Sequence, residues 1–177
     1  QGSGWEPYPT SLRIVNWVKY SFTGAALAAP TEASLAVQAR WLSQRLEWHL
    51  LGNHLFVNAK ALIFAGCYFE GPEAEGWLRT GLDIVLRELP EQLLPDGGQF
   101  ELSPMYHALM VEDLLDLLAL EGAYRLEAMA PLADRLRAVL PGALAWLAVP
   151  LPAVAHSRRS RRVAARHRCR CHARTPR

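Results

Sequence analysis

Residues 96–117, DGGQFELSPMYHALMVEDLLDL, combine a turn, a helix start and a long apolar run within one short stretch. The Pro-Asp-Gly-Gly run at residues 95–98 favours a tight turn, because glycine accepts the positive φ angles that such turns require. Ser103 has the side chain of a helix N-cap, and Pro104 suits the first helical position. The sequence therefore predicts a helix over residues 104–120 that begins directly after this turn.

A second stretch, residues 49–62 (HLLGNHLFVNAKAL), predicts another helix start with similar chemistry. Gly52 suits the left-handed position that closes one helix, and Asn53 is a good N-cap for the next. Unpaired backbone N–H groups at helix starts favour negative charge, so Asn53 and Tyr106 are candidates for an anion site. Since alternate helices of antiparallel hairpins begin at the same end, both starts should face one rim.

Apolar residues recur at helical spacing through most of the chain and predict an all-α fold. The helix near residues 53–69 is apolar nearly all round and should lie inside. Short connections favour antiparallel neighbours, so the expected architecture is a layer of stacked helical hairpins. The expected helices cover residues 10–22, 30–50, 53–69, 72–90, 104–120 and 124–146.

Taken together, these two stretches resemble the N-terminal helical domain of heparinase II/III-like polysaccharide lyases, a group that includes alginate lyases of similar fold. The sequences WEPY at residues 5–8 and RIVNW at residues 13–17 add to the resemblance, which covers about residues 4–148. It implies that the hairpins form part of an incomplete α/α toroid. It also implies β-elimination of a uronic-acid-containing polysaccharide. No cofactor or metal is expected, because no metal-ligand cluster is visible in the body of the sequence.

The resemblance implies catalytic roles for three residues. Asn53 and His54 would neutralise the uronate carboxylate, so that the anion formed on loss of the C5 proton is stabilised. Tyr106 would protonate the leaving glycosidic oxygen and, for some substrate stereochemistries, also act as the base. A further catalytic histidine comes from a C-terminal β-sandwich domain that has no counterpart in this chain. The expectation is therefore a truncated lyase domain that is inactive alone.

Further residues are expected to contact the acidic polysaccharide. Gln99 stands where many relatives carry a histidine, which leaves the role of that position open. The expected substrate-binding residues are Glu6, Tyr8, Arg13, Gln99, Glu101 and His107.

The net charge of +2 conceals two unlike parts. Residues 157–177 contain nine arginines and no acidic residue, which leaves a net charge of −7 on residues 1–156. The expected organisation is a helical domain over residues 1–148 and a basic, disordered tail over residues 149–177. The tail composition suggests a frameshifted reading of GC-rich coding sequence, so nucleic acid is not the expected partner. Zinc is not expected either, because the spacing of His167, Cys169, Cys171 and His172 is tighter than in common zinc modules.

Several charged and polar residues favour structural roles. Glu112, Asp113 and Asp116 are expected on a solvated helix face. Lys60 lies in an otherwise apolar helix and is expected to reach the surface or pair with an acid. His49 falls on the apolar face of the second expected helix, where it would be a buried, hydrogen-bonded histidine.

Two alternative functions remain open on the sequence. A toroid glycoside hydrolase would need two carboxylates across a cleft, for which Asp96 and Glu101 are the obvious candidates. A non-catalytic module that binds acidic glycans or a partner is the other. No apolar segment is long enough to predict a membrane span. No signal peptide is visible, and the resemblance makes a periplasmic or secreted location an expectation.

Overall fold

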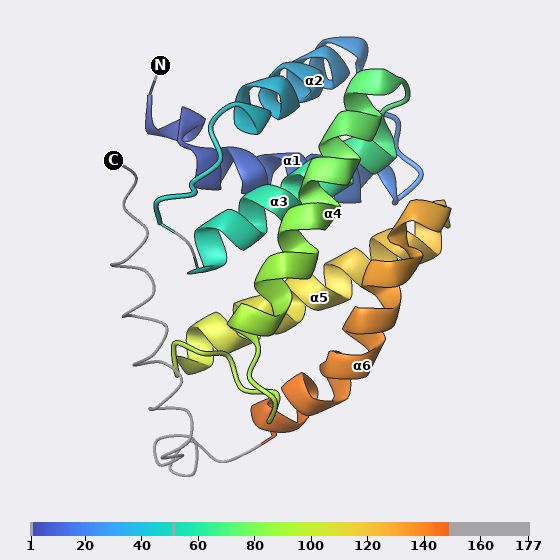
Figure 1. Cartoon of the computed structure of the whole chain (residues 1–177). Helices are drawn as coiled ribbons and strands as arrows, with labels where there is room; N and C mark the ends of the chain where they lie inside the picture. The colour runs from blue at the N-terminus through green and yellow to red at the C-terminus, as the bar shows by residue number, and fades with distance from the viewer. Residues whose placement is uncertain (1, 51, 149–177) are drawn as a thin grey trace.

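The computed structural model describes residues 2–50 and 52–148, and the regular elements in these ranges are helices (Figure 1). Short 3-10 helices, η1 (Ser3–Trp5) and η2 (Glu127–Met129), precede α1 and α6. The expected tail, residues 149–177, and its zinc candidates lie outside the described residues. The α-helices are α1 (Pro7–Ser21), α2 (Ala29–Ser43), α3 (Gly52–Tyr68), α4 (Pro72–Gln92), α5 (Pro104–Tyr124) and α6 (Ala130–Leu147).

Helix α3 is the centre of the fold. Every residue from Leu55 to Cys67 is buried, because α3 contacts α1, α2, α4 and α5. The closest packing is against α4, where a Cβ added at Gly66 would lie 2.6 Å from the Leu78 nitrogen and one at Gly81 would lie 2.7 Å from the Ala59 carbonyl oxygen. The prediction that the most apolar helix lies inside is confirmed, and glycine permits its close approach to α4.

The second helix ends earlier than the sequence predicted. Helix α2 stops at Ser43, and residues 44–50 form turns and irregular backbone. The reason lies at Glu47, whose backbone N–H donates to Asn58 Oδ1 over 2.9 Å and whose side chain is buried against α3. The expectation of a buried His49 is consequently wrong, because His49 is exposed on this turn segment.

The turn before α5 forms as predicted and holds the end of α6. Gly97 has a φ of 84°, and the Leu94 N–H donates to the Gly98 carbonyl over 2.9 Å. The Trp146 indole N–H donates to the Asp96 carbonyl over 2.7 Å. The turn therefore fixes both the start of α5 and the position of α6.

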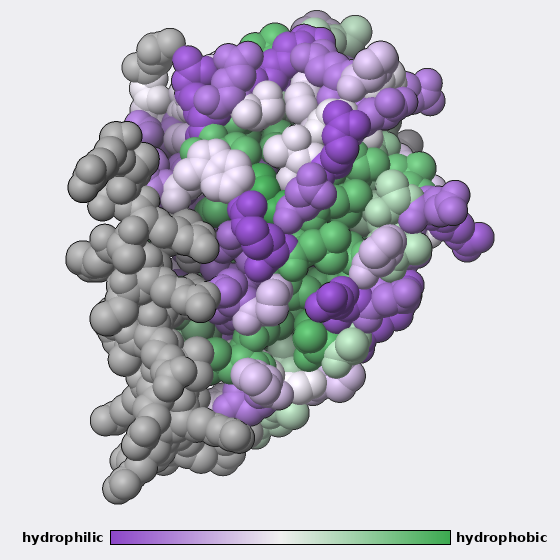
Figure 2. All heavy atoms as spheres, viewed as in Figure 1, coloured by the Kyte–Doolittle hydropathy of each residue, from purple (hydrophilic) through white to green (hydrophobic). Residues whose placement is uncertain are grey.

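The helices form an arc of antiparallel hairpins, α3 with α4 and α5 with α6, around the same apolar core (Figure 1). Figure 2 shows apolar side chains still at the surface on the face where α4, α5 and α6 lie. This open arc is the arrangement that part of an incomplete toroid requires. None of the helices within residues 2–50 and 52–148 has the length and apolar character to cross a bilayer.

Candidate functional site

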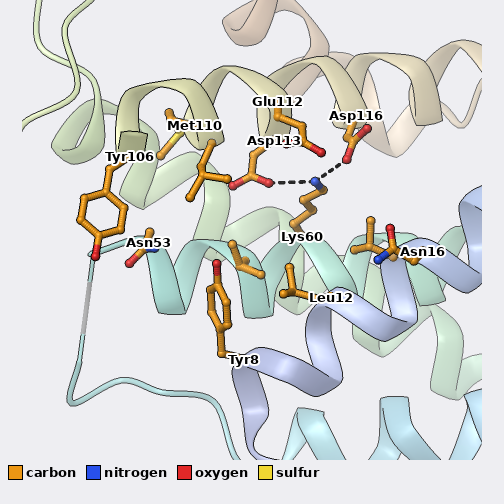
Figure 3. Close-up of a pocket in the computed structure, with 13 residues that line it drawn as sticks. Tyr8, Leu12, Asn16, Asn53, Lys60, Tyr106, Met110, Glu112, Asp113 and Asp116 are labelled. Carbon is orange, nitrogen blue, oxygen red and sulfur yellow. Dashed lines mark hydrogen bonds and ion pairs between the residues drawn. The ribbon is translucent and has the colours of Figure 1, made fainter. Parts of the chain in front are cut away.

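A pocket lies where the starts of α1, α3 and α5 meet. Tyr8 is the second residue of α1, Asn53 the second residue of α3 and Tyr106 the third residue of α5, and all three line the pocket. Figure 3 shows Tyr8 and Tyr106 reaching toward the region of Asn53 from opposite sides. Odd-numbered helices of the hairpin layer share one polarity, so their positive ends converge there. The prediction that the starts of α3 and α5 face one rim is confirmed.

Asn53 reaches the pocket from within α3 rather than capping it. Helix α3 begins at Gly52, so Asn53 is the second residue of the helix and the expected N-cap position of Asn53 is wrong. Gly52 does have the expected left-handed φ, at 54°. At α5 the prediction is confirmed, because the Ser103 hydroxyl accepts the Tyr106 N–H.

The inner part of the pocket contains a buried ion-pair network. Lys60 Nζ lies 2.8 Å from Asp113 Oδ1 and 2.5 Å from Asp116 Oδ2. Lys19 Nζ lies 2.7 Å from the other oxygen of Asp116. The expectation that Asp113 and Asp116 lie on a solvated face is wrong, because these carboxylates turn inward to the lysine of α3. The network ties α1, α3 and α5 together, and Figure 3 shows the two contacts of Lys60 with α5.

The protonation states in this network follow from burial and pairing. Burial alone would lower the pKa of Lys60, but Asp113 and Asp116 outweigh it and raise that pKa. Burial works against ionised Asp116, yet hydrogen bonds from Lys19 and Lys60 lower its pKa. Burial first, and Asp113 second, raise the pKa of Tyr8. Tyr8 therefore presents a protonated phenol that can donate a hydrogen bond to a ligand.

His54 lies beside the pocket and does not line it. Its Nδ1 is 3.2 Å from Glu47 Oε1, and its ring packs on that of Tyr8 with centroids 4.6 Å apart. Glu47 also accepts a hydrogen bond from Asn58 Nδ2 over 3.0 Å. Glu47 was not predicted as a site residue, because it lies in the stretch expected to be helix.

Arg13 and Gln99, which were also expected to contact substrate, form hydrogen bonds within the protein instead. The Arg13 guanidinium donates to the Gly4 carbonyl over 2.9 Å and to the Gln38 side chain. Gln99 is buried, and its side-chain Oε1 accepts the Glu101 N–H over 2.9 Å. Of the six expected contacts, only Tyr8 lines the pocket.

His107 is buried between the turn and α6. Its Nε2 donates to the Ala143 carbonyl over 2.8 Å, and its Nδ1 accepts the Gln99 N–H over 3.3 Å. Both ring nitrogens therefore form hydrogen bonds with the backbone of the protein. Glu6, at the exposed N-cap of α1, and Glu101 also lie outside the pocket lining.

The described residues contain no cluster of histidine, cysteine and carboxylate side chains able to hold a metal. Cys67 is buried next to Met129, and burial raises the pKa of its thiol to about 12. It is therefore a packing residue, since the thiolate is the reactive form. The carboxylates considered for a glycoside hydrolase are not in the pocket, and Asp96 instead accepts the Gly98 N–H over 3.1 Å.

Comparison with known proteins matches this helical layer to polysaccharide lyases. A profile of the family described as Heparinase II/III N-terminus matches residues 17–135. A heparin-sulfate lyase from Bacteroides stercoris is 51% identical over 57 residues, which cover 32% of this chain and 9% of that protein. A heparin-sulfate lyase from Pedobacter heparinus is 38% identical over 65 residues, covering 36% of this chain and 10% of that protein.

Solved structures agree with the sequence matches. A crystal structure of heparinase III superposes with a TM-score of 0.66 at 27% identity, covering 78% of this chain and 22% of that chain. The heparan sulfate lyase HepC from Pedobacter heparinus superposes with a TM-score of 0.63 at 26% identity, covering 81% and 23%.

Fold and sequence together place the chain with the N-terminal helical domains of the heparinase II/III group. The chain belongs to the heparinase II/III N-terminus family. The resemblance and the all-α architecture expected from the sequence are thereby confirmed. The chain spans about a tenth of the length of the curated relatives that it matches.

Proposed function

We propose that the pocket binds a uronate residue of an acidic polysaccharide, and that the domain serves an enzyme that cleaves this polysaccharide by β-elimination. The observation that carries the proposal is the meeting of Tyr8, Asn53 and Tyr106 at three helix starts. The relatives' name, heparin-sulfate lyase, favours a glycosaminoglycan as the substrate class.

The pocket and the adjoining His54 have the groups that would stabilise the anion formed in the first part of this reaction. A uronate carries its carboxylate on C5, and transfer of the C5 proton to a base (Tyr106 for some substrate stereochemistries, otherwise the further histidine that the resemblance implies) would create an anion delocalised onto that carboxylate. The Asn53 amide and, once it is protonated, the His54 ring would donate hydrogen bonds to the carboxylate and stabilise this anion. The positive ends of α1, α3 and α5 would add to the attraction for the carboxylate.

Tyr106 supplies the proton for the second part. As the C4–O bond breaks and the C4=C5 double bond forms, the leaving oxygen takes the phenolic proton of Tyr106. The resemblance implies that a further catalytic histidine comes from a C-terminal β-sandwich domain. Loss of one member of a cooperating set removes most of the rate enhancement, so we expect this chain alone to bind substrate and to show little or no elimination.

Binding by the chain itself is the first test. Titration with heparan sulfate oligosaccharides should show saturable binding. Asn53→Ala should weaken it at least about tenfold, the effect of losing a hydrogen bond to a charged group. Tyr106→Phe should change it by less than about twofold, because the hydroxyl acts mainly in proton transfer. Tyr20→Phe, on the exposed side of α1, is the matched control.

Elimination is tested in a hybrid in which this helical domain replaces the matching segment of the Bacteroides stercoris lyase. The unsaturated uronate formed by elimination is followed by its ultraviolet absorbance. We expect product from the hybrid and none from its Tyr106→Phe form. Binding by the chain with no product from a folded hybrid would favour a non-catalytic glycan module. Cleavage without ultraviolet absorbance would favour a hydrolase.

A further inference from the structure

A buried polar cluster stands behind His54. Glu47 Oε1 lies 3.2 Å from His54 Nδ1, and Glu47 Oε2 accepts from Asn58 Nδ2 over 3.0 Å. Asn58 also donates to Ser11 Oγ over 3.1 Å, and Ser11 donates to the Pro7 carbonyl over 2.8 Å. The cluster therefore joins the start of α1, which carries Tyr8, to the histidine at the start of α3.

The directions of these hydrogen bonds determine where the His54 proton lies. Asn58 Oδ1 accepts the Glu47 N–H, so Nδ2 is the atom that faces the carboxylate and donates to it. A carboxylate only accepts hydrogen bonds, so His54 Nδ1 must carry a hydrogen to bond with Glu47. In the neutral ring Nε2 then has the free lone pair. Among the described residues Nε2 makes no hydrogen bond, and 39% of the side chain is exposed.

We propose that Glu47 is a positioning residue that holds His54 in the Nδ1-protonated tautomer and so presents Nε2 to the glycan. The assignment of Nε2 to the glycan rests on the function proposed above, whereas the tautomer rests on the buried contacts alone. Nε2 would accept a hydrogen bond from a sugar hydroxyl or, once protonated, donate one to the uronate carboxylate. Glu47 touches no substrate and acts through His54.

His107 provides an internal reference with the opposite tautomer. Its Nδ1 accepts the Gln99 N–H, and its Nε2 donates to the Ala143 carbonyl. A spectrum that distinguishes ring tautomers should therefore show the two histidines as opposites. A variant that unfolds would lose the His107 pattern as well, which separates misfolding from a change at His54.

The test is the long-range ¹H–¹⁵N correlation spectrum of the labelled chain at a pH about two units above the ordinary histidine pKa of about 6.5. His54→Gln assigns the His54 signals. Wild-type His54 should show the Nδ1-protonated pattern. In Glu47→Gln, Asn58 still needs an acceptor, so the new carbonyl faces Asn58 and the new amide hydrogens face Nδ1. His54 should then change to the Nε2-protonated form, while Glu75→Gln, at an exposed position of α4, should leave it unchanged.

A wild-type His54 that is Nε2-protonated, or that exchanges between tautomers, would overturn the proposal even if Glu47→Gln failed to fold. An unchanged His54 pattern in folded Glu47→Gln would overturn it too.

Glycan titration adds a second readout for the same variants. Glu47→Gln should weaken heparan sulfate binding by about tenfold, and adding it to His54→Gln should cost little more, because both changes remove the same group. Fully additive losses would contradict action through His54. If wild type bound no glycan while the tautomers were as expected, the proposed function would fail and the positioning role of Glu47 would stand.

Discussion

The starts of α3 and α5 look alike in sequence, but they place their histidines in different environments. Each follows a glycine-containing segment and carries a histidine within its first turn. At α3 the histidine is partly exposed beside the pocket, with one ring nitrogen on Glu47 and the other unbonded within the described part of the chain. At α5 the histidine is buried, with both nitrogens bonded to the protein backbone. The environment of His54 therefore leaves one ring nitrogen free for a ligand, whereas the environment of His107 leaves none.

The two starts keep their relative position only if α3 and α5 stay tied, so the largest effect is expected at Lys60. Lys60→Met would leave Asp113 buried without its partner and should lower the free energy of unfolding by about 3–5 kcal/mol. Chemical denaturation monitored by circular dichroism measures this. The double variant Lys60→Met/Asp113→Leu should recover most of the loss, because it removes the unpaired charge. A single variant as stable as wild type would show that the network does not tie the helices.

The same variant should acquire a characteristic pH dependence. Burial already raises the pKa of Asp113 above its ordinary value, although Lys60 counteracts it. Without Lys60 this pKa should rise further. A carboxyl whose pKa is raised by folding stabilises the protein at low pH and loses that contribution as pH rises. As pH is lowered from 7 to about 5, toward the ordinary aspartate pKa of about 3.9, the free energy of unfolding of Lys60→Met should therefore increase relative to that of wild type. A loss over that interval relative to wild type would contradict the assignment.

Alanine at each histidine separates the two starts directly. His107→Ala leaves the Gln99 N–H and the Ala143 carbonyl without partners and should cost about 2–4 kcal/mol of unfolding free energy. His54→Ala should cost less than about 1 kcal/mol, since the ring is partly exposed. For the glycan affinity of the folded variants we expect the opposite order, with the larger loss in His54→Ala. Equal costs at the two positions would remove the distinction between a packing and a ligand-facing histidine.

The smallest expected difference concerns capping. Ser103→Ala removes the hydroxyl that accepts the Tyr106 N–H and should cost about 1 kcal/mol. Asn53→Ala should cost less than about 0.5 kcal/mol, because Asn53 lies inside α3 and its side chain faces the pocket. Thermal unfolding of both variants measures the difference. A larger loss of stability in Asn53→Ala than in Ser103→Ala would indicate that Asn53 does cap α3.

Helix spacing and turn chemistry were enough to predict most of the fold. The apolar surface of α3 and the Ser103-Pro104 start are local signals, and both are confirmed. The end of α2 was not predictable in this way. Residues 44–50 have helical patterning, but the backbone turns because Glu47 bonds to Asn58, and such a contact between distant residues leaves no periodic trace.

The candidate site was predictable in its outline and not in its supporting residues. Tyr8, Asn53 and Tyr106 were identified from motifs and meet in one pocket. Pairing with an acid was one of the two expectations for Lys60, and Lys60 does pair with Asp113 and Asp116. The roles of Asp113 and Glu47 depend on partners distant in the sequence, so they appear only when the helices pack together. Charged residues at helical spacing usually mark a solvated face, and that rule failed for Asp113 because Lys60 stands opposite it.

The most direct test is a crystal structure of the chain with a heparan sulfate oligosaccharide. We expect a uronate carboxylate within hydrogen-bonding distance of the Asn53 amide, with the adjoining glycosidic oxygen facing the Tyr106 hydroxyl. An oligosaccharide bound on the arginine-rich segment or elsewhere, with the pocket between α1, α3 and α5 empty, would contradict the account.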